Sequence, residues 1–139
     1  MRALSVWQPW ATLWMLGLKQ YETRHWSTDH RGPLAVHAAQ RVETEFGQPM
    51  RGYLDEVLGR DWATTIPRGA VLGMGVLTKI PRSSQIFHRL EGTELMLGNW
   101  APGRYGWLLE RRRQLAEPLP WCGRQGLFDV PDDKLAGLL

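Results

Sequence analysis

Two short segments of the sequence carry side chains that could act together in chemistry. Residues 7–10 read Trp-Gln-Pro-Trp and place an amide between two aromatic planes. Residues 19–26 bring Lys19, Glu22 and Arg24 close together along the chain. An amide can pair with a base edge, aromatic rings stack on bases, and Lys and Arg hold phosphates. Together the two segments favour a site for a nucleotide or a nucleic-acid strand.

The same residues also have a structural interpretation. Trp7 and Trp10 would then pack a helix against the core, and Lys19, Glu22 and Arg24 would form surface ion pairs, which add little to stability. If Lys19 and Glu22 instead lie near each other in a site, each shifts the proton affinity of the other, and both could exchange protons with a substrate. The residue types alone leave these interpretations open.

A third segment, Gly123-Arg124-Gln125-Gly126, lies near the other end of the chain. A glycine-flanked Arg-Gln pair can bring backbone N–H groups, a cation and an amide to a phosphate or a base. A plain surface turn can carry an arginine as well, so both interpretations stand.

Metal and cysteine chemistry are not expected. His25, His30 and His88 lack the spacing of metal ligands, so we predict no metal and no cofactor. Cys122 is the single cysteine, which excludes an internal disulfide and a cysteine-rich zinc site.

The elements that must position the first two segments can be predicted from local patterns. Residues 4–6 are typical of a short strand, and residues 9–16 of a helix that begins at a proline and is capped by Gly17. Residues 19–26 should be extended, so that Glu22, Arg24 and Trp26 point to one side and the residues between them to the other.

Further strands and helices are expected along the rest of the chain. The sequence predicts strands at 34–39, 70–80, 104–115 and 126–130, and helices in the second half of 42–58, within 84–97 and in the tail from 131. Within the strand at 70–80, Gly73 and Gly75 suggest a bulge or a close backbone approach. Residues 111–113 are three arginines, for which a solvated strand edge is the expected place.

These elements predict an α+β, barrel-like fold of five or six strands with two flanking helices, in a single domain spanning residues 1–139. Hydrophobic residues make up 43% and charged residues 22%, as in soluble globular proteins. No apolar run approaches the length of about 20 residues that crosses a bilayer, and the first residues are unlike a signal peptide. We therefore expect a cytoplasmic protein without membrane contact.

The net charge of +3 is unevenly distributed. Residues 19–41 and 104–124 are basic, whereas 42–61 is acidic. A fold that joins the two basic segments would create a positive face, which favours a polyanionic partner. Of the eight tryptophans, most should be core residues.

The motifs also resemble a known family. The sequence is similar to the opening of ASCH domains, which are related to the PUA domains of RNA-modifying proteins, in Leu4-Ser5-Val6-Trp7-Gln8-Pro9-Trp10-Ala11, Gly17, Lys19, Glu22, Arg24, Trp26 and Arg31-Gly32. The resemblance continues at 34–39, 69–76 and 123–127, and is closest to the transcription-coactivator type. It implies a PUA-like β-barrel in which the first helix and its flanking strands border a cleft that binds RNA, DNA or a nucleotide.

On this basis the roles of individual residues can be assigned as expectations. Trp7, Trp10 and Trp26 would supply stacking surfaces or walls, and Gln8 and Gln125 would bond to base edges. Lys19, Arg24 and Arg124 would contact phosphates. His37 lies in the family's strand beside the cleft, although a lone strand histidine is more often a packed, hydrogen-bonded residue.

Some ASCH-like proteins are enzymes, either amidohydrolases of acylated cytidine that use Thr, Lys and Glu, or ribonucleases. Lys19 matches the amidohydrolase lysine, but Glu22 stands where that pattern has Thr, and Thr23 should face the other way. The leading hypothesis is therefore a nucleic-acid or nucleotide-binding module. The alternatives are a hydrolase or ribonuclease with Lys19 and Glu22 as acid and base, and a protein-interaction module whose tryptophans form an exposed apolar patch.

Overall fold

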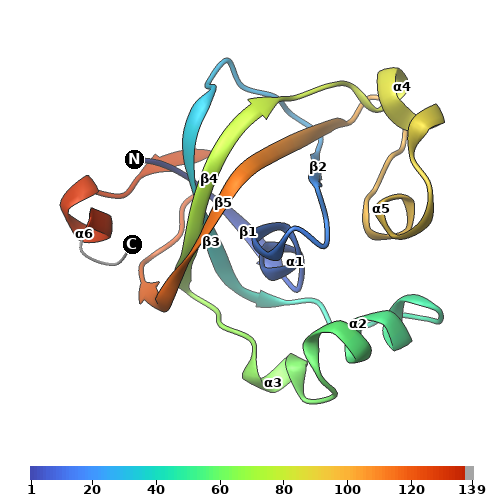
Figure 1. Ribbon diagram of the computed structural model, residues 1–139, viewed down its shortest axis with the longest axis horizontal. Helices are drawn as coiled ribbons and strands as arrows, with labels where there is room; N and C mark the ends of the chain where they lie inside the picture. Colours follow the sequence, from blue (N-terminus) through green and yellow to red (C-terminus); the bar gives the residue numbers. More distant parts are fainter. Residues whose placement is uncertain (137–139) are drawn as a thin grey trace.

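A computed structural model describes residues 1–136 of the chain. One curled sheet forms its frame, from β1 (Arg2–Gln8), β2 (Tyr21–Arg24), β3 (Gly32–Val42), β4 (Ala70–Lys79), β5 (Tyr105–Pro120) and β6 (Leu127–Asp129). The strand order is β2-β5-β4-β3-β1-β6, with β1 and β3 parallel and the other pairs antiparallel. The sheet curls into a half-barrel (Figure 1). The predicted α+β class, with a barrel-like sheet of five or six strands and flanking helices, is confirmed, with six strands.

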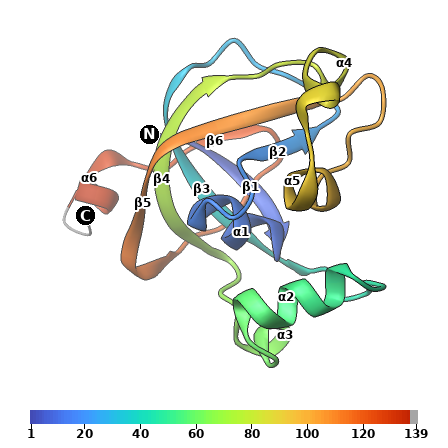
Figure 2. The same ribbon diagram turned by 45° about the vertical axis from the view of Figure 1, so that its right-hand side comes forward.

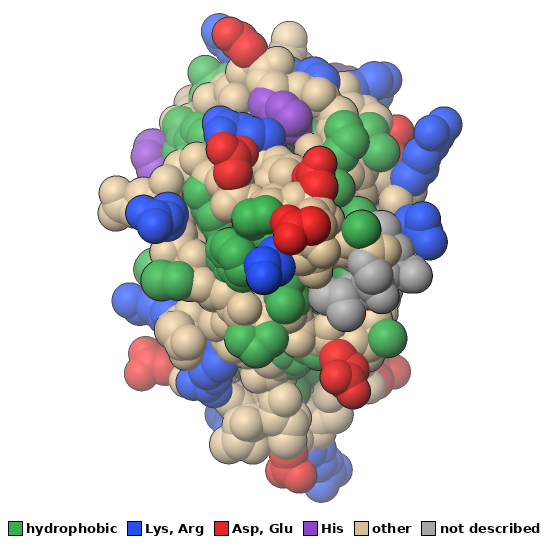
Figure 3. Space-filling model, turned by 90° about the vertical axis from the view of Figure 1, so that its left-hand side faces the viewer, with side chains coloured by type: hydrophobic (Ala, Val, Ile, Leu, Met, Phe, Trp, Pro, Cys, Tyr) green, Lys and Arg blue, Asp and Glu red, His purple; other side chains and the backbone are tan. Residues whose placement is uncertain are grey.

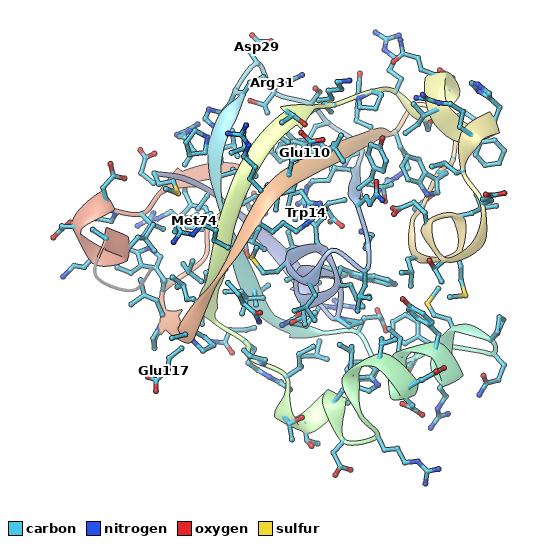
Figure 4. The ribbon with its side chains drawn as sticks, viewed as in Figure 1. Trp14, Asp29, Arg31, Met74, Glu110 and Glu117 are labelled. Atoms are coloured by element: carbon cyan, nitrogen blue, oxygen red, sulfur yellow. The ribbon has the colours of Figure 1, made fainter. Side chains whose placement is uncertain are left out.

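Helix α1 (Trp10–Leu16) fills the concave side of the sheet (Figure 2). Its Ala11, Trp14 and Met15 pack against inward-facing strand residues such as Leu4 and Val36. Trp14 lies inside the curve of the sheet (Figure 4). Gly17 ends the helix in the left-handed region at φ 79°, as the sequence predicts, and the chain turns directly into the segment that leads to β2.

The remaining helices surround this frame. They are α2 (Met50–Leu58), α3 (Trp62–Thr65), α4 (Ser83–Ile86), the 3-10 turn η1 (Phe87–Arg89), α5 (Gly92–Leu97) and α6 (Asp132–Ala136). Helices α2, α3 and α5 share a core with Leu13 on the outer side of α1. Helix α6 packs on the other face of the sheet, against residues such as Ala35 and Phe128. No helix among residues 1–136 is long and apolar enough to cross a membrane.

The helical regions divide more finely than the sequence predicted. The sequence predicted helices at 9–16, in the second half of 42–58, within 84–97 and in the tail from 131, and the structure has six short helices among its described residues. Helix α3 was not expected, and the region 84–97 divides into α4, η1 and α5. These helices have four to nine residues, too short for a clear 3.6-residue period, and tertiary packing stabilises them.

Strand β5 also runs further than predicted. It continues past 115 through Pro118 to Pro120, although prolines usually interrupt a sheet. Beyond Leu108, however, β5 pairs only with β4, so a proline can lack an N–H donor on the open side. The register of β4 against β5 shifts on both sides of Gly73, and a Cβ there would lie 2.7 Å from the Met15 sulfur. The predicted bulge and close approach are therefore confirmed.

The expectation of a solvated edge for residues 111–113 is wrong for Arg112. Its Nε donates to the Trp14 carbonyl at 2.7 Å, and its Nη2 donates to the Gln20 carbonyl at 3.2 Å. Arg112 therefore donates to one carbonyl in α1 and to another in the turn after it, so it joins the open edge of β5 to the end of α1.

Candidate functional site

Two adjoining cavities lie between β1, β2 and the last loop of the chain. The first, about 510 Å³, is bordered by β1, α1 and β2, with an apolar wall from the α2 and α5 regions. The second, about 1050 Å³, lies between β1, β3 and residues 121–126. Both are lined by Ser5, Trp7, Arg24 and His25. Because these residues line both cavities, the cavities adjoin, and we call the two together the cleft.

Trp7 is the exposed aromatic side chain of the cleft. Ser5 and Trp7 alternate along β1 with buried Leu4 and Val6, so they face away from the α1 core. The Trp7 side chain is 48% exposed. The guanidinium carbon of Arg41 lies 4.1 Å from the centre of its ring, a cation–π contact that holds the indole in place.

A charged cluster lies at the floor of the first cavity. The Lys19 ammonium forms an ion pair with one Glu22 oxygen, and Arg24 Nη1 donates to the other oxygen at 3.2 Å. Lys19 is 2% and Glu22 7% exposed. Two cations therefore hold one buried carboxylate. The Nε of Arg24 is buried and has no hydrogen-bond partner among residues 1–136.

The two sides of β2 differ, as the alternation predicts. Glu22 and Arg24 contact each other on one side. On the other side the Thr23 hydroxyl accepts a bond from the Asn99 N–H at 3.1 Å, and Arg104 Nη2 donates to the Thr23 carbonyl at 3.1 Å. Thr23 is thus engaged with the loop before β5, although it also lines the first cavity.

His37 is buried at the base of the second cavity. Its Nε2 bonds to the Trp121 carbonyl at 2.7 Å and its Nδ1 to the Ser5 hydroxyl at 2.9 Å. A carbonyl only accepts, so Nε2 carries the proton and Nδ1 accepts the bond from Ser5. Burial lowers the pKa of His37 below its ordinary value, which favours the neutral imidazole.

Gly123 covers this pair. A Cβ at position 123 would lie 2.7 Å from the His37 ring and 2.9 Å from the Ser5 hydroxyl, so only glycine fits there. Beside it, Arg124 and Gln125 are exposed at the rim of the second cavity. Trp26 lines the same cavity and packs edge-on against Trp107 at 4.8 Å between ring centres.

The lowered pKa of His37 predicts a pH dependence of stability. The unfolded chain protonates this side chain near 6.5, whereas the folded protein does so only at lower pH. Between these values the unfolded state binds more protons, so the free energy of unfolding falls as the pH drops through this window and is regained above it. Urea unfolding at about pH 7.5 and 5 should show a smaller acid loss in His37→Gln than in wild type.

The exposed His88 provides the control for this prediction. His88→Gln should keep the acid loss of the wild type. An unchanged acid loss in His37→Gln would show that other groups cause it.

Gln8 is the one predicted site residue that does not line the cleft. It is fully buried, and its Nε2 donates to the Thr12 hydroxyl and to the Pro67 carbonyl, both at 2.7 Å. Its Oε1 accepts from the Thr12 N–H at 2.9 Å. Gln8 therefore fixes the start of α1, and its amide does not face the cleft.

All other predicted site residues line the cleft. They are Trp7, Trp10, Lys19, Glu22, Arg24, Trp26, His37, Arg124 and Gln125. Ser5 was missed, although its place two residues before Trp7 puts it on the same side of β1. Asn99 and Arg104 were missed as well, because nothing in the sequence places the loop before β5 beside β2.

The tryptophans do not form the exposed apolar patch that a protein-interaction module would require. Trp14, Trp62, Trp100 and Trp107 are buried, and Trp7 is exposed within the cleft. On the face that carries α6, acidic and basic side chains are interspersed (Figure 3). Arg24 and Arg124, one from each of the two basic segments, line the same cavity.

Comparison with known proteins gives a family match and a shared fold. The family model described as ASCH domain matches residues 4–118. The human protein Activating signal cointegrator 1 is 36% identical over 73 residues, which are 50% of this chain but only 13% of that protein. The crystal structure of ASCH from Zymomonas mobilis has a TM-score of 0.59 at 14% identity, covering 99% of this chain and 94% of that one. The crystal structure of a point mutant of that bacterial protein has a TM-score of 0.56 with the same identity and coverage.

Proposed function

The chain belongs to the ASCH domain family, and from this premise we propose that its cleft binds an unpaired nucleotide, free or within a single strand of RNA or DNA. ASCH domains are associated with RNA binding. The observation that carries the proposal is the cleft of two adjoining cavities, whose lining combines an exposed tryptophan with cationic side chains.

Trp7 supplies the stacking surface for a base. Its indole is held by Arg41 on one face and lines both cavities. Inside a duplex, the neighbouring base pairs cover both faces of a base. A base that stacks on Trp7 must therefore lie outside a duplex. The proposed ligand is therefore an unpaired nucleotide and not a duplex.

Arg24 and Arg124 supply the phosphate contacts. Both line the second cavity, and Arg24 also lines the first. The Arg24 side chain is 24% exposed, whereas its unpaired Nε is buried. Lys19 is buried against Glu22 and would act through Arg24, whose position it helps to set by sharing the same carboxylate. Gln125, exposed at the rim, is the remaining candidate for a base-edge contact.

Removing the stacking surface tests the proposal. Trp7→Ala should weaken the binding of short single-stranded oligonucleotides by about 1–3 kcal/mol, or about 5- to 150-fold, because one base loses its partner. Fluorescence anisotropy at low salt, with RNA and DNA oligomers, measures this. The matched control is Phe87→Ala, which removes a 50% exposed aromatic ring outside the cleft.

Phe87→Ala should leave the affinity unchanged. If the wild-type protein binds none of the oligomers at low salt, the proposal fails. If both variants bind as the wild type does, Trp7 is not the stacking surface.

A second candidate is catalysis on RNA or on an acylated cytidine, favoured by the Lys19–Glu22 pair at the floor of the first cavity. The pair could act as acid and base. Turnover by the wild-type protein that is lost in Lys19→Ala would support this candidate. Absence of turnover with both substrates would exclude these two reactions.

A further inference from the structure

We propose that Ser5 and His37 form a nucleophile and general base that catalyse acyl transfer from carboxylic esters. This activity is distinct from nucleotide binding and does not use the Lys19–Glu22 pair. The two residues lie opposite each other in the parallel register of β1 and β3. The rigid sheet therefore fixes their separation, which suits a catalytic pair.

The direction of the hydrogen bonds fits the roles. The Ser5 hydroxyl lies 2.9 Å from His37 Nδ1, within the reach that a nucleophile and its base require. On the other side of the ring, Nε2 donates to the Trp121 carbonyl at 2.7 Å. This bond holds the tautomer in which Nδ1 is free to accept the serine proton. A backbone carbonyl here takes the orienting position that an aspartate has in a Ser-His-Asp triad.

The nucleophile is accessible whereas its base is not. Ser5 is partly exposed and lines both cavities, at the point where they join. His37 is 1% exposed behind it. Gly123 lies over the pair without a side chain, and the Cβ distances above show that a larger residue would press on both groups. A substrate therefore reaches the hydroxyl from the cleft.

Arg24 is the group that can stabilise negative charge. It lines both cavities, as Ser5 does, and its side chain is partly exposed. A guanidinium beside the reacting carbon favours the oxyanion of the tetrahedral intermediate. Trp7, on the same strand and the same side as Ser5, offers an aromatic surface. The site thus fits esters with an anionic or aromatic leaving group.

The reaction proceeds in two balanced steps. The Ser5 oxygen bonds to the acyl carbon while its proton moves to His37 Nδ1, and the bond to the leaving alcohol breaks as that proton passes to the alcohol oxygen. Water then bonds to the acyl carbon, gives its proton to Nδ1, and releases the carboxylic acid as Ser5 regains its proton.

A fluorophosphonate probe tests the nucleophile directly. The Ser5 oxygen would bond to phosphorus, fluoride would leave, and the serine proton would pass to His37. Intact mass and peptide mapping should find one adduct on Ser5 in the wild type and in Ser27→Ala, an exposed serine outside the cleft. Ser5→Ala should show no adduct, and His37→Gln should react about 10²–10⁴-fold more slowly.

The hydrolysis of p-nitrophenyl acetate provides a second readout, as a burst of p-nitrophenol equal to the protein concentration. The burst rate should rise with pH through a midpoint below 6.5, because burial lowers the pKa of His37. Arg24, His25 and Arg124 line the cavity in front of this histidine, and the positive charge of the two arginines favours its neutral form too.

Two results would overturn the proposal. One is a folded wild-type protein, shown by cooperative thermal unfolding, that neither takes the probe nor gives a burst. The other is equal labelling of folded Ser5→Ala. In either case the hydrogen bond serves only to join β1 to β3. Oligonucleotide binding measured on the same samples distinguishes this failure from a failure of the proposed nucleotide site.

Discussion

Glu22→Gln is expected to lower the free energy of unfolding by about 3–5 kcal/mol, the cost of removing one partner of a buried ion pair. Lys19 is 2% exposed and would keep its ammonium group without the carboxylate that now neutralises it. The remaining Arg24 adds a second cation beside the amide and increases the repulsion. Urea unfolding at neutral pH measures the loss.

Two further variants make this result specific. Lys19→Met combined with Glu22→Gln removes the buried charge together with its partner, so it should be more stable than Glu22→Gln alone. Glu43→Gln breaks a largely solvent-accessible ion pair with the exposed Arg41, whose groups lie 3.9 Å apart, and should cost less than about 1 kcal/mol. A double variant no more stable than the single one would contradict the view that the unpaired Lys19 causes the loss.

Arg24→Gln combined with Arg124→Gln is expected to weaken oligonucleotide binding by about 10²-fold or more at low salt, since hydrogen bonds to charged groups contribute about 1.5–3 kcal/mol each. The slope of log affinity against log salt should also fall by about one for each cation removed, because fewer counterions are released. Anisotropy titrations at several salt concentrations give both quantities.

The matched control is Arg51→Gln combined with Arg60→Gln. Both arginines are exposed and line neither cavity of the cleft. This variant loses the same net charge, so it corrects for long-range attraction. An equal loss of affinity in both double variants would show that binding depends on overall charge and not on the cleft.

Local patterns predicted the part of the site that is close in sequence. The αL glycine at position 17 and the two-residue period of β2 place Lys19, Glu22 and Arg24 together, and the structure confirms this contact. Arg124 and Gln125 were joined to them only through the family resemblance. No short-range pattern brings residues 121–126 onto β1, since that approach depends on the sheet order β3-β1-β6.

Other features depend on tertiary contacts that a sequence pattern does not contain. Gln8 has the residue type of a base-reading side chain, yet the approach of the Pro67 carbonyl and of Thr12 occupies its amide. Arg112 lies in a run of arginines typical of a solvated edge, yet its guanidinium donates to the Trp14 carbonyl in α1. In both cases the fold brings a carbonyl that is distant in sequence to the side chain, that of Pro67 to Gln8 and that of Trp14 to Arg112. The hydrogen bond to this carbonyl gives the side chain a structural role.

The most direct test of the cleft is a ¹H–¹⁵N titration of the wild-type protein with a short single-stranded oligonucleotide. We predict that the perturbed signals will include the Trp7 indole and the backbone amides of Ser5, Arg24, His25 and residues 121–126, which line the two cavities. Saturating perturbations confined to α2, α6 or the outer side of β5, with the Trp7 indole unchanged, would contradict the proposal that this cleft is the binding site.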